Sequence, residues 1–140
     1  MTDTTDDDIE SLLNVDTIAV VGCSGTPGKA AHDVPAYLQR QGYDIVPVNP
    51  NREEILGRPS VDSLAEVGAA VDLVDVFRPS EAVSGVVSDV LERVAARDDV
   101  QGVWLQRGIR DDDAAARARE AGLRVVQDRC LKVEHRRHSE

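Results

Sequence analysis

A glycine-rich segment with two hydroxyl groups and a lysine runs from Gly22 to Lys29, in the order Gly-Cys-Ser-Gly-Thr-Pro-Gly-Lys. It follows the apolar run 17–21 and precedes a helical pattern. Glycines let backbone N–H groups approach phosphate oxygens closely, hydroxyl groups donate further hydrogen bonds, and a helix start favours an anion. The segment therefore predicts a phosphate-binding loop. A glycine-rich turn without a ligand is the alternative.

The spacing inside this segment disfavours the P-loop of nucleotide hydrolases. A P-loop places four residues between its first glycine and the Gly-Lys pair, and Ser or Thr follows the lysine. Here five residues separate Gly22 from Gly28, and Ala30 follows Lys29. ATP hydrolysis is therefore not expected.

The loop also departs from the dinucleotide-binding pattern Gly-x-Gly-x-x-Gly. Ser24 takes the place of the second glycine and Pro27 that of the third. The next apolar run ends in Pro-Val-Asn-Pro, so Asn49 stands where an NAD-binding protein carries the Asp or Glu that bonds the ribose hydroxyls. Ordinary NAD binding is therefore disfavoured.

The cysteines and the histidine near the loop do not form a catalytic set. Cys23 lies close to a helix start, where the pKa of a thiol can be lowered, although a buried, inert cysteine is the commoner case. His32 is the only histidine near the loop, and Cys130 stands far from Cys23 without a metal-binding spacing. We expect free thiols, no bound metal and no positioned acid, base and nucleophile.

Apolar runs and helical patterns alternate along the chain and must position this loop. A continuous apolar run, which suits a strand buried on both faces of a parallel sheet, lies at 17–21, and largely apolar runs repeat this pattern at 45–48, 73–77, 103–105 and 123–126. Apolar residues at helical spacing predict a helix over 80–97, with Ser80 as its N-cap. Two further helices are predicted before Gly42 and Gly122, which suit the C′ position, and acidic residues 111–113 favour the start of the second of them.

Strand, helix and strand in repetition predict a single α/β domain. Right-handed crossovers then give a Rossmann-like, doubly wound parallel sheet of five strands, and we expect the strand order 3-2-1-4-5. A short turn at 63–67 crosses from the second strand to the third. In such a sheet the ligand lies where the strand order reverses, beyond the carboxyl ends of the strands, so the loop after the first strand is the expected site.

The composition limits the kinds of binding partner that we expect. The chain has 140 residues and a formal net charge of −10, which argues against nucleic acid because phosphate backbones need a basic face. It shows no long apolar run and starts with acidic residues, so we expect a cytoplasmic protein without a membrane contact. Aspartate outnumbers glutamate 17 to 9, and two lysines stand against 14 arginines, a composition that resembles proteins of salt-loving organisms. An ordinary acidic protein is the alternative.

The acidic composition predicts a response to salt. If the carboxylates are adapted to a saline cytoplasm, screening of their mutual repulsion will raise the melting temperature substantially between dilute and molar KCl. Thermal unfolding followed by circular dichroism at several KCl concentrations measures this effect. A flat response would favour the ordinary acidic protein.

Five segments in order carry a family resemblance. They read VVGCSGTPGK, GYDIVPVNPN, DLVDVFRPSE, GVWLQRGI and AGLRVVQDRCLKVEH. Together they resemble the small CoA-binding proteins called YccU-like or CoA-binding domain 2, which are similar in turn to the CoA-binding domain of the succinyl-CoA synthetase α subunit. The resemblance divides the chain into an acidic segment 1–14, a CoA-binding domain 15–136 and a charged tail 137–140.

The resemblance implies a set of cofactor-binding residues. The glycine loop would hold the pyrophosphate through Gly22, Ser24, Gly25, Pro27 and Lys29. The adenosine side would be lined by Val48, Asn49 and Pro50, with Arg52 at the 3′-phosphate. The pantetheine path would be flanked by Phe77, Arg78, Pro79, Gln106 and Gly108. Phe77 and the Trp residue of the fourth strand also suit the core, and each arginine alone suits a solvated surface.

Coenzyme A or an acyl-CoA is thus the expected ligand, bound by a non-catalytic binding, carrier or sensor module. The alternative is a small Rossmann-fold enzyme that uses NAD(P) or acts on a CoA thioester. The sequence leaves open the acyl form, the pathway, and whether the partner is a second copy of the chain or an acyl-CoA enzyme.

Overall fold

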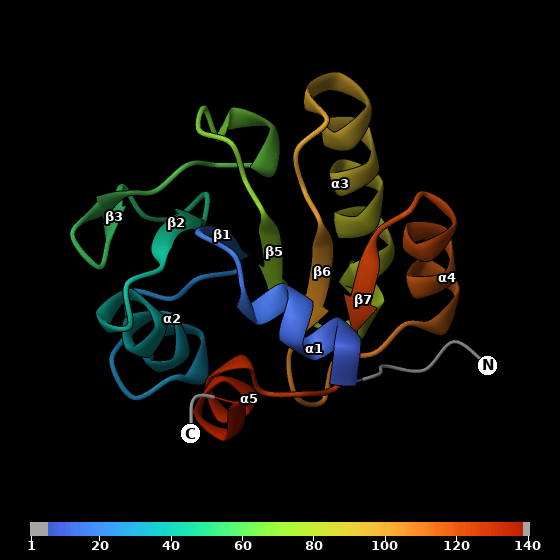
Figure 1. Cartoon of the computed structure of the whole chain (residues 1–140). Coiled ribbons are helices and arrows are strands. Elements are labelled where there is room, and N and C mark those ends of the chain that lie inside the picture. The colour runs from blue at the N-terminus through green and yellow to red at the C-terminus, as the bar shows by residue number, and fades with distance from the viewer. Residues whose placement is uncertain (1–5, 139–140) are drawn as a thin grey trace.

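The computed structural model describes residues 6–138. A parallel sheet of five strands forms its centre, in the order β2-β1-β5-β6-β7 (Figure 1). These strands are β1 (Thr17–Val21), β2 (Asp44–Val48), β5 (Leu73–Val76), β6 (Gly102–Leu105) and β7 (Arg124–Val126). Each falls on one of the predicted apolar runs, because strands covered on both faces need continuous apolar sequence. The predicted fold class is therefore confirmed.

The predicted strand order is wrong in the place of the third strand. Counted along the chain, the five strands lie in the order 2-1-3-4-5 rather than 3-2-1-4-5. After β2 the chain forms a small hairpin of β3 (Glu54–Ile55) and β4 (Arg58–Pro59). Val61 then pairs with the outer edge of β2, bonding Pro47 and Asn49 at 3.2 and 2.9 Å. This edge is therefore occupied, and β5 pairs with β1, so the order reverses between β1 and β5.

Helices cover both faces of the sheet. They are α1 (Asp6–Leu13), α2 (Ala30–Arg40), α3 (Val83–Arg97), α4 (Asp112–Glu120) and α5 (Leu131–His138), with short 3₁₀ turns η1 (Leu64–Glu66) and η2 (Ser80–Ala82). Figure 1 shows α1, α2 and α5 grouped together, apart from α3 and α4. In the described part of the chain, no helix is long and apolar enough to cross a membrane.

Helix ends follow the predicted signals with one exception. Gly42 and Gly122 follow α2 and α4 with φ of +103° and +92°, as expected for C′ glycines. Asp111 caps α4 by accepting a hydrogen bond from the Ala114 N–H at 3.0 Å. Ser80 is not a side-chain N-cap of α3: it begins η2, and its hydroxyl accepts from the Arg110 N–H at 3.0 Å.

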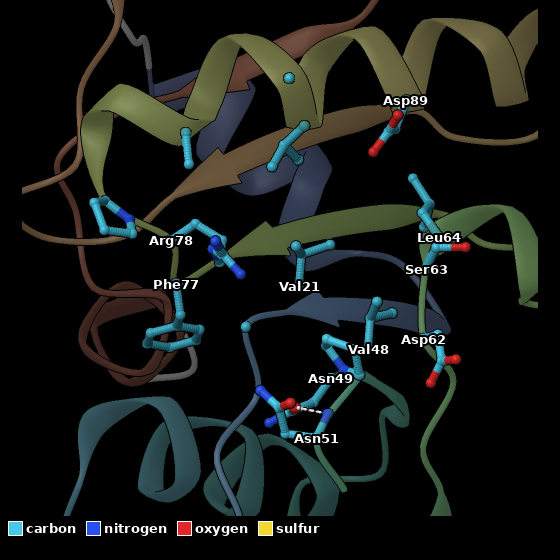
Figure 2. Close-up of a pocket in the computed structure, with 16 residues that line it drawn as sticks. Val21, Val48, Asn49, Asn51, Asp62, Ser63, Leu64, Phe77, Arg78 and Asp89 are labelled. Atoms are coloured by element: carbon cyan, nitrogen blue, oxygen red, sulfur yellow. Dashed lines mark hydrogen bonds between the residues drawn. The ribbon is translucent and has the colours of Figure 1, made fainter.

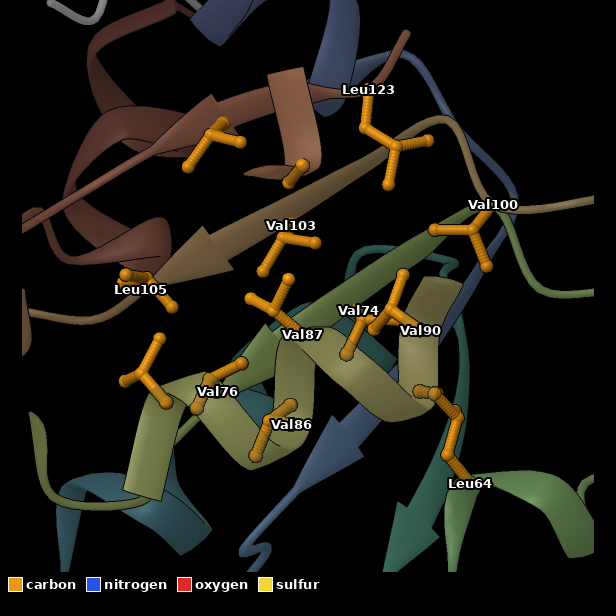
Figure 3. Close-up of a cluster of buried hydrophobic side chains, with 14 of the residues drawn as sticks. Leu64, Val74, Val76, Val86, Val87, Val90, Val100, Val103, Leu105 and Leu123 are labelled. Atoms are coloured by element: carbon orange, nitrogen blue, oxygen red, sulfur yellow. The ribbon is translucent and has the colours of Figure 1, made fainter. Parts of the chain in front are cut away.

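Two cores lie on opposite faces of the sheet, because successive strand residues point to opposite sides. Figure 3 shows the first, where Val86, Val87 and Val90 of α3 pack on Val74 and Val103 of the sheet. The second core lies under α1, α2 and α5 and includes the fully buried Trp104. Trp104 is therefore a core residue, and its indole N–H donates to the Arg129 carbonyl at 2.8 Å.

The sequence did not predict the first and last helices. Ile9 and Leu12 of α1 are 1% and 0% exposed, and Leu131 of α5 is 0% exposed. Their few apolar residues stand among charges, which hides the helical spacing. Both helices complete the second core, so these charged segments also contribute to the folded domain.

Candidate functional site

A cavity of about 620 Å³ opens at the carboxyl ends of β1, β2 and β5, where the strand order reverses. Figure 2 shows Val21 and Val48 at its centre, with Phe77 and Arg78 at one end and Leu64 and other residues of the η1 segment at the opposite end. Of the predicted site residues, Gly22, Val48, Asn49, Pro50, Phe77, Arg78 and Pro79 line it. Its volume is in the range of small-molecule sites.

Gly22 sits where the chain leaves β1 for the glycine loop. Its φ is +86°, and its N–H donates to the Val48 carbonyl at 3.0 Å. A Cβ built there would lie 3.2 Å from the Phe77 carbonyl and 3.1 Å from the Arg78 side chain. Gly22 therefore keeps the ends of β1 and β5 close together, and its lack of a side chain matters more than its N–H.

Most N–H groups of the glycine loop are already used within the protein. Ser24 donates to the Ala31 carbonyl, Thr26 to the Ser24 hydroxyl, and Gly28 to Asp33, at 3.0, 3.0 and 3.1 Å. Hydrogen bonds from His32 and from the Gly28 N–H hold the pKa of Asp33 below its usual value. These contacts fold the loop into a fixed turn and reduce the number of N–H groups open to an anion.

Arg52 lies directly over this loop, although it comes from the segment after β2. A Cβ built on Gly25 would overlap the Arg52 guanidinium, so the guanidinium rests directly against the backbone of Gly25. Among residues 6–138, the Gly25 N–H donates no hydrogen bond to another backbone group. The exposed Arg52 guanidinium therefore places a cation against the glycine loop, which suits an oxyanion.

Asn49 joins the two loops that border the cavity. Its amide group donates to the Cys23 carbonyl at 2.8 Å, and its side-chain oxygen accepts from the Asn51 N–H at 2.7 Å (Figure 2). A carboxylate at this position could not donate to Cys23. Asn49 is thus a positioning residue that fixes the loop after β2 against the glycine loop.

Sequence reasoning missed the far wall of the cavity. Asp62, Ser63 and Leu64 reach it from the η1 segment, and Val86 and Asp89 from α3. The helical spacing predicted α3, but that pattern marks which residues face the sheet and not which border an opening. With the correct strand order, the connection from β2 to β5 and helix α3 would have been expected beside the place where the strand order reverses.

Several predicted site residues lie outside this cavity. Ser24, Gly25, Pro27 and Lys29 belong to the neighbouring loop, and Lys29 is the N-cap residue of α2. Gln106 is 4% exposed and donates to Asp75 at 2.6 Å. The Gly108 N–H donates to Asp128 at 2.6 Å.

Two titratable groups are buried close together, Cys23 in the glycine loop and Asp75 in β5. Burial raises the pKa of the Cys23 thiol to about 12, and the Asp75 carboxyl adds to this shift. Burial also raises the pKa of Asp75 to about 7, against the opposing effect of its hydrogen bond from Gln106. The helix start therefore does not lower the pKa of Cys23, which is a neutral thiol at physiological pH.

Comparison with known proteins decides the family. The chain matches the family described as CoA binding domain over residues 16–136. It belongs to this CoA-binding domain family. The resemblance drawn from the five sequence segments is thereby confirmed. YneT, an uncharacterized protein of Bacillus subtilis, is 40% identical over 126 residues, which are 90% of each chain.

Two further relatives show the range of this family. A structure from Thermus thermophilus, cell-free ID.343, has 42% identity and a TM-score of 0.86, covering 96% of this chain and 98% of that one. The alpha subunit of an ADP-forming acetate–CoA ligase II from Pyrococcus furiosus is 26% identical over 136 residues. That match covers 89% of this chain but 29% of the subunit, so the chain is related to one region of a longer acyl-CoA synthetase component.

Proposed function

We propose that this chain binds coenzyme A or an acyl-CoA and acts as a non-catalytic binding, carrier or sensor module. The observation that carries the proposal is the cavity at the β1–β5 switch point beside the glycine loop, in a chain that belongs to the CoA-binding domain family. Ligands of open α/β sheets bind at this place because loops on either side of it diverge.

The pyrophosphate of the ligand would lie against the glycine loop, and its 3′-phosphate beside Arg52. The Gly25 N–H supplies a donor in the loop, and the Arg52 guanidinium against Gly25 supplies a cation. Lys29, exposed at the start of α2, adds a second cation nearby in the loop. These local positive charges would offset the repulsion of an anionic ligand by a chain of net charge −10.

The adenosine part would lie in the cavity. Val21, Val48, Leu64 and Val86 provide apolar walls for a flat ring system. Asp62, Ser63 and Asp89 offer acceptors for its amino group. The cavity thus supplies the mixture of apolar surface and few polar groups that a nucleotide requires.

A binding role is supported by the chemistry of the groups around the cavity. The thiol of Cys23 is buried and has a raised pKa, so it is a poor nucleophile. His32 lies beyond the cavity and bonds Asp33 at 2.9 Å. Among residues 6–138, the cavity lining holds no histidine, cysteine or lysine, and its Ser63 hydroxyl donates to Glu66, outside the lining, at 3.3 Å.

The ligand order tests the proposal. We expect CoA to bind more tightly than dephospho-CoA, because Arg52 suits the 3′-phosphate. We expect NAD to bind far more weakly, because Asn49 lacks the carboxylate that favours free ribose hydroxyls. Arg52→Ala should remove most of the difference between CoA and dephospho-CoA. Because Arg52 is exposed, that loss should be about 1 kcal/mol, roughly fivefold in Kd. Calorimetric titration with the three ligands measures each value.

Arg40→Ala provides the matched control, because Arg40 is also exposed but ends α2 and does not line the cavity. It should leave the ligand order unchanged. NAD binding as tight as CoA binding would reject the proposed function in favour of a nucleotide-dependent enzyme. An unchanged difference in Arg52→Ala would reject only the role of that residue.

A further inference from the structure

A second cavity, of about 570 Å³, lies at the carboxyl ends of β6 and β7. It opens between the β6–α4 loop and helix α5, and four arginines line it: Arg107, Arg110, Arg129 and Arg137. It shares no lining residue with the first cavity. The two are neighbours, because the Arg110 N–H donates to Ser80, which follows the cavity residue Pro79.

The charge in this second cavity is opposite to that of the whole chain. Its lining carries four guanidinium groups and two carboxylates, Asp128 and Glu134, and a third carboxylate, Asp112, pairs with Arg110 at 3.1 Å. An Asp128 oxygen already accepts the Gly108 N–H at 2.6 Å. In a chain of net charge −10, four of the 14 arginines are thus gathered in one hollow.

Glu134 holds two of these arginines in place but does not use all of their hydrogen-bond donors. Its side chain is 6% exposed, and one of its oxygens lies 3.6 Å from Arg129 and 3.5 Å from Arg137. A buried carboxylate needs such partners, but these contacts are long, and each guanidinium has five N–H donors. Donors therefore remain on both arginines. Arg107 is exposed and forms no ion pair with any residue between 6 and 138.

We propose that this cavity binds a small oxyanion, a carboxylate or phosphate group, between the guanidiniums of Arg107, Arg129 and Arg137. Like charges gathered in one hollow repel each other, and an oxyanion relieves that repulsion. The planar guanidinium also matches the paired oxygens of carboxylate and phosphate. Glu134 is the positioning residue that fixes the two arginines nearest to α5.

Two sources of such an oxyanion fit this chemistry. One is a free anion such as inorganic phosphate. The other is a carboxylate at the end of the acyl group of a CoA thioester. The thioester would be held in the first cavity, and its acyl group would extend past the Ser80–Arg110 contact into the second. This second source rests on the proposed function, and the first does not.

Titration with inorganic phosphate at constant ionic strength tests the site directly. We expect saturable shifts of the backbone amide signals of Gly108, Asp128 and Arg129 in ¹⁵N NMR spectra. Arg107→Gln should weaken the apparent affinity about tenfold, because it removes a charged donor. Arg136→Gln is the matched control: Arg136 is an exposed α5 residue that does not line the cavity, so the affinity should stay unchanged.

A pair of matched thioesters tests the second source. If the acyl carboxylate occupies the cavity, malonyl-CoA should bind about tenfold more tightly than propionyl-CoA, and Arg107→Gln should remove the preference. Phosphate shifts without this preference would assign the site to a free anion. The absence of both effects, or an equal response in Arg107→Gln, would overturn the oxyanion site. Phosphate shifts in a protein that does not bind CoA would reject the proposed function alone.

Discussion

Gly22→Val is expected to weaken CoA binding at least about a hundredfold while leaving the helical circular dichroism signal largely intact. Gly22 has a φ of +86°, and a Cβ there would already lie 3.2 Å from the Phe77 backbone. The two valine methyl groups must extend further, at the point where β1 and β5 meet beside the cavity. They would displace the ligand or separate the loops that hold it. Calorimetric titration with CoA measures the affinity.

Gly122→Val separates this effect from backbone strain. Gly122 has a similar φ of +92°, but it follows α4 and has open space around a built Cβ. Strain at positive φ costs about 1–3 kcal/mol at either position, so both variants should lose stability. Only Gly22→Val should lose CoA affinity. Unchanged CoA binding by folded Gly22→Val would reject the place of the glycine loop in the site.

The sheet could be predicted from the sequence because burial on both faces leaves a local signature. Every strand of the sheet overlaps a predicted, largely apolar run, and the turn at 63–67 contains the observed η1. The strand order could not be predicted in this way. It depends on Val61, which pairs with β2 through its backbone, and a backbone contact leaves no sequence pattern.

The site residues that directly follow a strand could be predicted from the sequence. Those on the connection from β2 to β5 and on α3 were missed. Gly22, Asn49 and Arg78 border the cavity because each follows a strand that ends at the same edge of the sheet. Asp62 and Asp89 also border it, but only the three-dimensional path of η1 and α3 brings them there. The position of Arg52 over Gly25 is likewise a tertiary contact, which neither the spacing nor the resemblance indicated.

Asp75 is a charged residue type inside an otherwise apolar strand. It lies in register between Val20 of β1 and Trp104 of β6, and it is 0% exposed. Gln106 donates to one carboxyl oxygen, while the other oxygen has no hydrogen-bond partner among the described residues. Ionisation in this position is costly, which is why the pKa of Asp75 rises to about 7.

The raised pKa predicts that Asp75 makes the protein less stable as the pH rises. Between about pH 4 and pH 7 the folded chain keeps a proton on Asp75 that the unfolded chain releases, so this stabilisation is present at low pH and is lost as the pH passes the folded pKa. From pH 5 to pH 8 the loss should be about 2.5 kcal/mol in the free energy of unfolding.

Asp75→Asn isolates this contribution, because asparagine keeps an acceptor for Gln106 but cannot ionise. Burial lowers the pKa of His135, which acts in the opposite direction, and this effect cancels when variant and wild type are compared at each pH. Urea unfolding at fixed KCl should therefore show the variant gaining about 2.5 kcal/mol relative to wild type between pH 5 and pH 8. A constant difference across this range would mean that Asp75 does not change its protonation on folding.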